Sequence, residues 1–176
     1  MGQPMNTALV DYGIREERSD IRAHVCIEAK TVYVYPTRAG IVAIETGKYR
    51  AAPAYTGTIK TAMGYLVPPA EINFCRAVPI PSRVLEKASF SPSDDTTAKG
   101  EKAVRVVCWL LRAGLFPLWV TPAFVEEAEM QIEGMDILVR MNTRIQVKCD
   151  WRGGVGLRCT GNLFLQTQEC NPFGRH

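Results

Sequence analysis

The period of the hydrophobic pattern changes near residue 93. Before that point, β-branched and aromatic residues recur in short runs that glycine and proline separate, which is typical of strands. The pattern predicts a strand over 24–35, a turn over 36–40, a second strand over 41–45 and one or two further strands between 55 and 67. The first part of the chain is therefore expected to be mostly β.

After residue 99 a helical period appears. Apolar side chains at 104, 107, 108, 110 and 111, with arginines opposite, predict an amphipathic helix over 101–113 that ends at Gly114. Strands are predicted over 115–120, 135–140, 144–150 and 162–168, while 122–133 fits either a short acidic helix or a loop. A mixed α+β fold follows from these elements.

The polar, turn-forming stretch from residue 91 to 97 marks the expected boundary between two modules. Residues 1–92 would form a β-rich N-terminal module that positions a ligand or builds a dimer. Residues 93–176 would form the core that carries chemistry. No internal repeat or low-complexity tract is present.

Composition narrows the function classes. In 176 residues, 47% are hydrophobic and 22% are charged, which supports an ordinary core and excludes wholesale disorder. No run of about 18 apolar residues could span a membrane. The net charge of +3 permits nucleic-acid binding without requiring it. The N-terminus lacks a signal-like stretch, so we expect a cytoplasmic protein that is not bound to a membrane.

The six cysteines form no C-x-x-C pair and are expected to be reduced, mostly buried thiols. A zinc site built from Cys149, Cys159 and Cys170 is conceivable, but its spacing matches no usual zinc motif. The histidines His24 and His176 lie in no recognisable catalytic arrangement, and His24 is expected to be a satisfied strand residue.

The strand over 144–150 carries the candidate chemistry. Its alternation places Gln146, Lys148 and Asp150 on one face and apolar residues on the other. Asp136 opens the preceding strand, so its carboxylate is expected near this polar row. A carboxylate, an amide oxygen and a backbone carbonyl suit Mg²⁺, which prefers oxygen ligands and keeps several waters. Lys148 would assist an attacking water and contact a phosphate.

A helix with a glutamate, followed by D-x(9)-Q-x-K on two successive strands, resembles the PD-(D/E)XK nuclease superfamily over about residues 96–170. The stretch from Gln146 to Asp150, followed by Thr160-Gly161-Asn162 and an apolar strand, also resembles some phage and bacterial members. The resemblance implies a restriction-endonuclease-like mixed sheet with a leading helix. It implies Glu101, Asp136 and Gln146 as metal ligands and Lys148 as the catalytic lysine. Gln146 departs from the pattern because it stands where the family has an acid.

Four arginines surround these strands and are expected to bind DNA: Arg140, Arg144, Arg152 and Arg158. Guanidinium groups and the exposed amides of the glycine-rich segment at 153–156 can both donate to phosphate oxygens. The alternative is an ordinary hairpin loop. The tyrosines of the N-terminal module could stack on bases, although packing is the more common use of tyrosine.

The sequence therefore predicts a Mg²⁺- or Mn²⁺-dependent DNA endonuclease that acts as a homodimer, because cutting both strands usually takes two sites. The alternative is a catalytically inactive nuclease-like fold that binds nucleic acid or protein. A purely structural or interaction protein is the third possibility.

Overall fold

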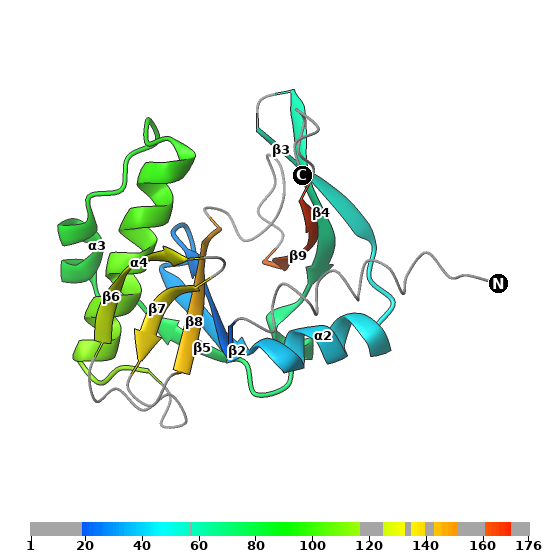
Figure 1. Cartoon of the computed structure of the whole chain (residues 1–176), viewed down its shortest axis with the longest axis horizontal. Coiled ribbons are helices and arrows are strands. Elements are labelled where there is room, and N and C mark those ends of the chain that lie inside the picture. The colour runs from blue at the N-terminus through cyan, green and yellow to red at the C-terminus, as the bar shows by residue number, and fades with distance from the viewer. Residues whose placement is uncertain are drawn as a thin grey trace.

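The computed structural model describes residues 19–56, 58–116, 125–132, 135–139, 143–150 and 161–169. The fold is mixed α+β, and the described part contains two sheets and three α-helices (Figure 1). The expected α+β class is confirmed. Among the described helices, none has the length and apolar character needed to cross a membrane.

The larger sheet has six strands in the order β5-β2-β1-β8-β7-β6. They are β1 (Ile21–Cys26), β2 (Thr31–Pro36), β5 (Arg76–Pro79), β6 (Val125–Ile132), β7 (Met135–Val139) and β8 (Thr143–Cys149). Neighbouring strands are antiparallel except for the central pair, β1 and β8, which are parallel. The centre of this sheet therefore joins an early strand to a late one.

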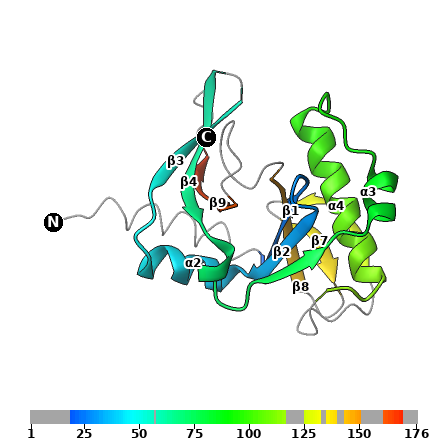
Figure 2. The same ribbon diagram turned by 180° about the vertical axis from the view of Figure 1, so that it is seen from behind.

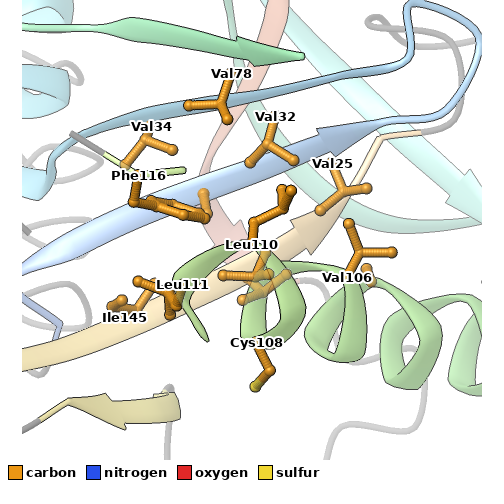
Figure 3. Packing of buried hydrophobic residues seen from close by; sticks show 14 of the residues in the cluster. Val25, Val32, Val34, Val78, Val106, Cys108, Leu110, Leu111, Phe116 and Ile145 are labelled. Atoms are coloured by element: carbon orange, nitrogen blue, oxygen red, sulfur yellow. The ribbon is translucent and has the colours of Figure 1, made fainter. Parts of the chain in front are cut away.

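Helices α4 (Thr96–Arg112) and α3 (Ser82–Ala88) lie over one face of this sheet. Asp95 caps α4 by accepting a hydrogen bond from the N–H of Ala98 at 2.8 Å, as aspartate commonly does at a helix start. Figure 3 shows Leu110 and Leu111 pointing from α4 toward the strands that carry Val32 and Ile145. The apolar residues that recur every 3.6 positions in α4 thus pack against those that recur every two positions in the strands, and together they form one apolar layer.

The smaller sheet is antiparallel, in the order β3-β4-β9. It consists of β3 (Ala51–Thr56), β4 (Ile59–Val67) and β9 (Leu163–Glu169). Its apolar residues, such as Leu163 and Leu165, share a second core with Ile44 of helix α2 (Thr37–Thr46) and with Tyr35 of β2. The short 3₁₀ turn η1 (Pro69–Glu71) follows β4. Figure 2 shows the two sheets from behind, with α2 beneath the smaller one.

Gly64 in β4 is required by a close approach to β9. A Cβ atom added at residue 64 would lie 2.4 Å from the carbonyl oxygen of Leu165 and 2.8 Å from the ring of Phe164. The pairing of β4 with β9 shifts register at this point, between Met63 and Gly64. A glycine inside a strand pattern commonly marks such a bulge or close contact.

Three local predictions are wrong. The expected turn over 36–40 and the expected strand over 41–45 form one helix, α2, because Ile41 and Ile44 face the second core at helical spacing. The expected strand over 24–35 is two strands joined by a turn over 27–30, where Lys30 adopts a positive φ of 49°. Part of the ambiguous segment 122–133 is the strand β6. Of the strand expected at 115–120, residues 117–120 lie outside the described residues.

The expected division into residues 1–92 and 93–176 does not separate two structural units. Strand β1, from the first part, lies between β2 and β8 in the larger sheet. Strand β9, from the second part, pairs with β4 in the smaller sheet. The polar segment near residue 92 is a connection before α4, since each sheet contains strands from both sides of it.

Candidate functional site

A row of polar side chains lies on the face of β1 and β8 that α4 does not cover. Side chains alternate along these strands, so Ala23 and Ile145 belong to the apolar layer against α4. The intervening positions face the other way, and the parallel register sets Arg22 beside Gln146 and His24 beside Lys148. The sheet thus gathers two cations, an imidazole and an amide within two adjacent strands.

Arg22 contacts Gln146 directly. The Nη2 of Arg22 donates to Oε1 of Gln146 at 3.1 Å, and Arg22 is only 1% exposed. A buried guanidinium must be hydrogen-bonded, because burial removes its water. The amide oxygen of Gln146 is therefore oriented by a fixed positive charge.

His24 is also 1% exposed, and its Nε2 lies 2.8 Å from the hydroxyl of Tyr35 on β2. The two rings are stacked, with centroids 5.5 Å apart. Burial holds the pKa of His24 well below its usual value of 6.5, and the charges of Arg22 and Lys148 lower that pKa further. The imidazole is therefore neutral at pH 7. Its buried Nδ1 has no hydrogen-bond partner within the described part of the chain.

Strand β7 brings Asp136 to the same region. Ile137 of β7 pairs with Ile145 of β8, and Leu138 pairs with Arg144. Continued by one residue, this antiparallel register would set Asp136 across from Gln146. Asp136 lies on β7, and Gln146 and Lys148 lie on the neighbouring strand β8.

Glu101 is not brought to this region. It lies on the exposed side of α4, while the buried side of that helix, with Ala103 and Val107, packs on the apolar face of the sheet. Gln146 and Lys148 lie on the opposite face. The expectation that Glu101 joins Asp136 and Gln146 in one metal site is therefore corrected. Although the sequence places Glu101 at the border of an apolar stripe, it does not specify which face of the sheet that stripe covers.

Of the four expected DNA-binding arginines, the structure describes Arg144. Its backbone N–H donates to Oδ2 of Asp20 at 2.8 Å, and its Nε lies 3.4 Å from the same oxygen. Arg144 therefore helps to fix the start of β1 against β8. Arg140, Arg152 and Arg158 lie outside the described residues, as do Thr160 and the glycine-rich segment at 153–156.

None of the described cysteines forms a disulfide bond with another described cysteine: Cys26, Cys75, Cys108 and Cys149. Burial raises the pKa of Cys75 to about 11, and burial with the charge of Asp150 does the same for Cys149. These two thiols are protonated at neutral pH and poor nucleophiles. No group of three or more His, Cys, Asp or Glu side chains that could hold a metal occurs among the described residues. Cys159 and Cys170, the other expected zinc ligands, lie outside that part of the chain.

Sequence reasoning missed Arg22 and the pairing of His24 with Tyr35. The signal was present in β1, where arginine and histidine alternate with isoleucine, alanine and valine. Alternation alone suggests a solvated outer face and does not reveal that both residues are buried. The parallel contact between β1 and β8 has no local signature in the sequence.

The described side chains of this region include two cations, Arg22 and Lys148, and a neutral imidazole, His24. Asp136 and Asp150 add acidic positions at the margins of the row. Lys148, which is half-buried, can donate to a phosphate group, whereas a divalent cation would depend on Asp136 and on oxygens that a substrate brings. No protein-family model matches the chain, and comparisons with curated proteins and with solved structures find no match.

Proposed function

We propose that the protein is a metal-dependent DNA endonuclease that hydrolyses phosphodiester bonds. The observation that supports this proposal is the register of β7 and β8, in which Ile137 pairs with Ile145, so that one further residue along the ladder would set Asp136 across from Gln146. Lys148 lies two residues further along the same face of β8. An acid, an oxygen donor and a lysine on adjacent strands are the parts that hydrolysis of a phosphodiester with Mg²⁺ or Mn²⁺ requires.

The order of elements supports the same proposal. Helix α4 is followed by β6, β7 and β8, which form an antiparallel meander beneath it. This is the helix-then-strands arrangement expected of a restriction-endonuclease-like core. The parallel neighbour of β8 is β1, which precedes the helix in sequence. The N-terminal segment thus completes the sheet of the proposed core.

The residues present fit a magnesium ion only together with a phosphate of the DNA. Asp136 would be the one carboxylate ligand, and Gln146 would offer an amide oxygen that also accepts from Arg22. Mg²⁺ commonly takes one or two carboxylates from a protein and completes its shell with waters and substrate phosphates. When bound, the metal would activate water and neutralise charge on the phosphate.

The chain's own residues have separate roles in this proposal. Lys148 would orient the attacking water and contact the scissile phosphate. Arg22 would hold the Gln146 amide in place, and its charge would favour the approach of a phosphate. The neutral His24 would keep the centre of the row from becoming more cationic at pH 7.

Cleavage of supercoiled plasmid and of branched DNA with Mg²⁺ or Mn²⁺ tests the proposal. We expect nicking by the native chain and its loss in Asp136→Asn and in Lys148→Met, which keeps the length of the lysine stem. Arg83→Ala, which removes one exposed cation from α3, is the matched control and should cut normally. Full activity in Asp136→Asn would refute the assignment. A homodimer, measured by light scattering, is expected if both strands are cut.

The contact between Arg22 and Gln146 supports a second candidate, a nuclease-like module that binds nucleic acid without cutting it. Residue 146 is an amide and not a second acid that would hold a metal firmly. Its oxygen also already accepts a hydrogen bond from the cation Arg22. Gln146→Glu separates the two candidates. It should stimulate cleavage if the site is active and give no cleavage if the module only binds, with DNA binding retained in both cases.

A further inference from the structure

The β3–β4 hairpin extends past the rest of the molecule, on the side where β8 ends (Figures 1 and 2). Its tip carries exposed apolar side chains. Tyr55 is 56% exposed and Ile59 is 46% exposed, although both are residue types that a sheet usually buries. Among the strands that the structure describes, only β4 of this hairpin pairs with a further strand, β9, so β3 is at the edge of the described sheet. A protruding ribbon with an exposed aromatic tip is typical of a contact surface.

At this tip an aromatic ring and a cation are adjacent. Tyr55 is directly opposite Lys60 in the register of β3 and β4, so both side chains lie on the same side of the ribbon. Both residues are exposed. Two other tyrosines near this region use their hydroxyls within the protein: Tyr35 is hydrogen-bonded to His24, and Tyr49 donates a hydrogen bond to Glu71. Tyr55 has no such partner among the described residues.

The charged residues in the hairpin and directly before it have one sign. Lys60 lies in β4 and Lys48 and Arg50 precede β3, and residues 46–70 contain no aspartate or glutamate. All three cations are exposed. Their sum of +3 equals the formal net charge of the whole chain, +3, so the charges of the other residues cancel. A solvated strand surface ordinarily mixes both signs, whereas a phosphate backbone is attracted to cations alone.

We infer that the β3–β4 hairpin is a DNA-binding arm that recognises unpaired bases beside the candidate site. Lys60 and Arg50 bind backbone phosphates, and the ring of Tyr55 stacks on an exposed base. Stacking on an aromatic side chain tolerates any base, and it needs a base that is free of its own neighbours in the duplex. The inference rests on the proposed function for the identity of the partner, DNA, and adds that the substrate has a single-stranded segment.

Fluorescence anisotropy with two labelled DNAs, a blunt duplex and the same duplex with a single-stranded extension, tests the arm. The buffer contains EDTA, so binding is measured without cleavage. The native chain should prefer the extended duplex. Tyr55→Ala should lose at least about fivefold in affinity for the extended duplex and little for the blunt one. Tyr55→Phe should bind like the native chain, because stacking uses the ring and not the hydroxyl.

The double variant Arg50→Ala, Lys60→Ala tests the phosphate contacts. It should weaken binding to both DNAs similarly and reduce the slope of log Kd against log salt concentration by about one to two. Arg83→Ala removes a cation from α3 and should leave affinity and salt slope unchanged. Thermal unfolding would verify that each variant is folded, which the exposure of these positions favours.

Native affinity and native salt slope in both the Tyr55→Ala and the double variant would overturn the inference, as would the absence of DNA binding by the native chain. This failure is distinguishable from failure of the nuclease proposal. Cleavage that depends on Lys148, together with DNA binding that the hairpin variants do not change, would support the nuclease proposal and refute the DNA-binding arm. Hairpin-dependent binding without cleavage would keep the arm and favour the non-cutting module.

Discussion

Arg22 and Gln146 lie side by side on the two parallel strands at the centre of the larger sheet, and Nη2 of Arg22 donates to Oε1 of Gln146 at 3.1 Å. The relationship gives a physical reason for glutamine, and not an acid, at residue 146. A carboxylate there would face a buried guanidinium at hydrogen-bond distance, and the two would form an ion pair. The amide accepts the same hydrogen bond without neutralising Arg22.

The contact between Arg22 and Gln146 predicts that the effect of Gln146→Glu on stability and on metal affinity depends on whether Arg22 is present. Because Arg22 is already desolvated, a carboxylate at 146 gains a charge-assisted hydrogen bond, and the free energy of unfolding should rise by about 1 kcal/mol. The metal affinity should rise only a little, since Arg22 competes for the same oxygens. In the Arg22→Met background the stability gain should vanish and the gain in affinity for Mn²⁺ should be larger.

The four proteins are the native chain, Gln146→Glu, Arg22→Met and the double variant. Their urea unfolding gives the coupling free energy between residues 22 and 146, and calorimetric titration gives their affinities for Mn²⁺. The double-mutant cycle is informative because these side chains touch. Additive free energies, within about 0.3–0.5 kcal/mol, would show that Arg22 does not act on residue 146.

His24 predicts that the fold loses stability in mild acid. Its pKa in the folded protein is held well below 6.5 by burial and by the charges of Arg22 and Lys148, whereas the unfolded chain takes up the proton near pH 6.5. The unfolded state then binds more protons than the native state below pH 6.5. The free energy of unfolding should therefore fall as the pH decreases from 6.5, by at most about 1.4 kcal/mol per pH unit.

Chemical unfolding of the native chain and of His24→Gln at pH 7.5 and pH 5.5 measures this contribution. The variant should be less stable at pH 7.5, because the contact with Tyr35 is altered, and should lose less stability between the two pH values. An equal loss in both proteins would assign the acid sensitivity to other groups.

The parts of the fold that the sequence predicted are those with a local signal. The apolar period predicted helix α4 over 101–113, although the helix begins earlier, at Thr96 after the cap at Asp95, and the pair β7 and β8 follows from alternation around a short turn. Helix α2 was missed because its β-branched and alternating residues favour a strand, and packing against the second core decided otherwise. The interleaving of the two sheets is a long-range property that no window of sequence contains.

For the candidate site, too, the features with a local signal in the sequence were predicted and those that depend on tertiary packing were missed. The pairing of β7 with β8 required only a hairpin around a short turn, and the shared face of Gln146 and Lys148 followed from alternation. The misplacement of Glu101 and the omission of Arg22 have a different cause. Both depend on which face of the sheet α4 covers and on which strand lies beside β8, and these are decided by tertiary packing.

The cap of α4 predicts a specific pair of outcomes at residue 95. Asp95→Ala removes the acceptor for the N–H of Ala98 and should lower the free energy of unfolding by about 1 kcal/mol. Asp95→Asn keeps an acceptor oxygen and should be within about 0.5 kcal/mol of the native chain. Urea unfolding monitored by circular dichroism distinguishes them. An equal loss in both variants would mean that the charge at the helix N-terminus matters more than the hydrogen bond.

Two glycines in different surroundings predict opposite effects of the same substitution. At Gly64 a new Cβ would lie 2.4 Å from the carbonyl oxygen of Leu165, which is backbone of the paired strand and cannot yield without breaking that pairing. Gly64→Ala should therefore destabilise the protein by about 1–3 kcal/mol.

Gly100 lies inside α4 with nothing within 4 Å of the added Cβ. Gly100→Ala should stabilise the protein by about 0.5–1 kcal/mol, because alanine loses less conformational entropy in a helix. Urea unfolding of both variants compares the two sites with identical chemistry. A loss of stability in Gly100→Ala would show that α4 meets another group at that position, and native stability in Gly64→Ala would contradict the close contact between β4 and β9.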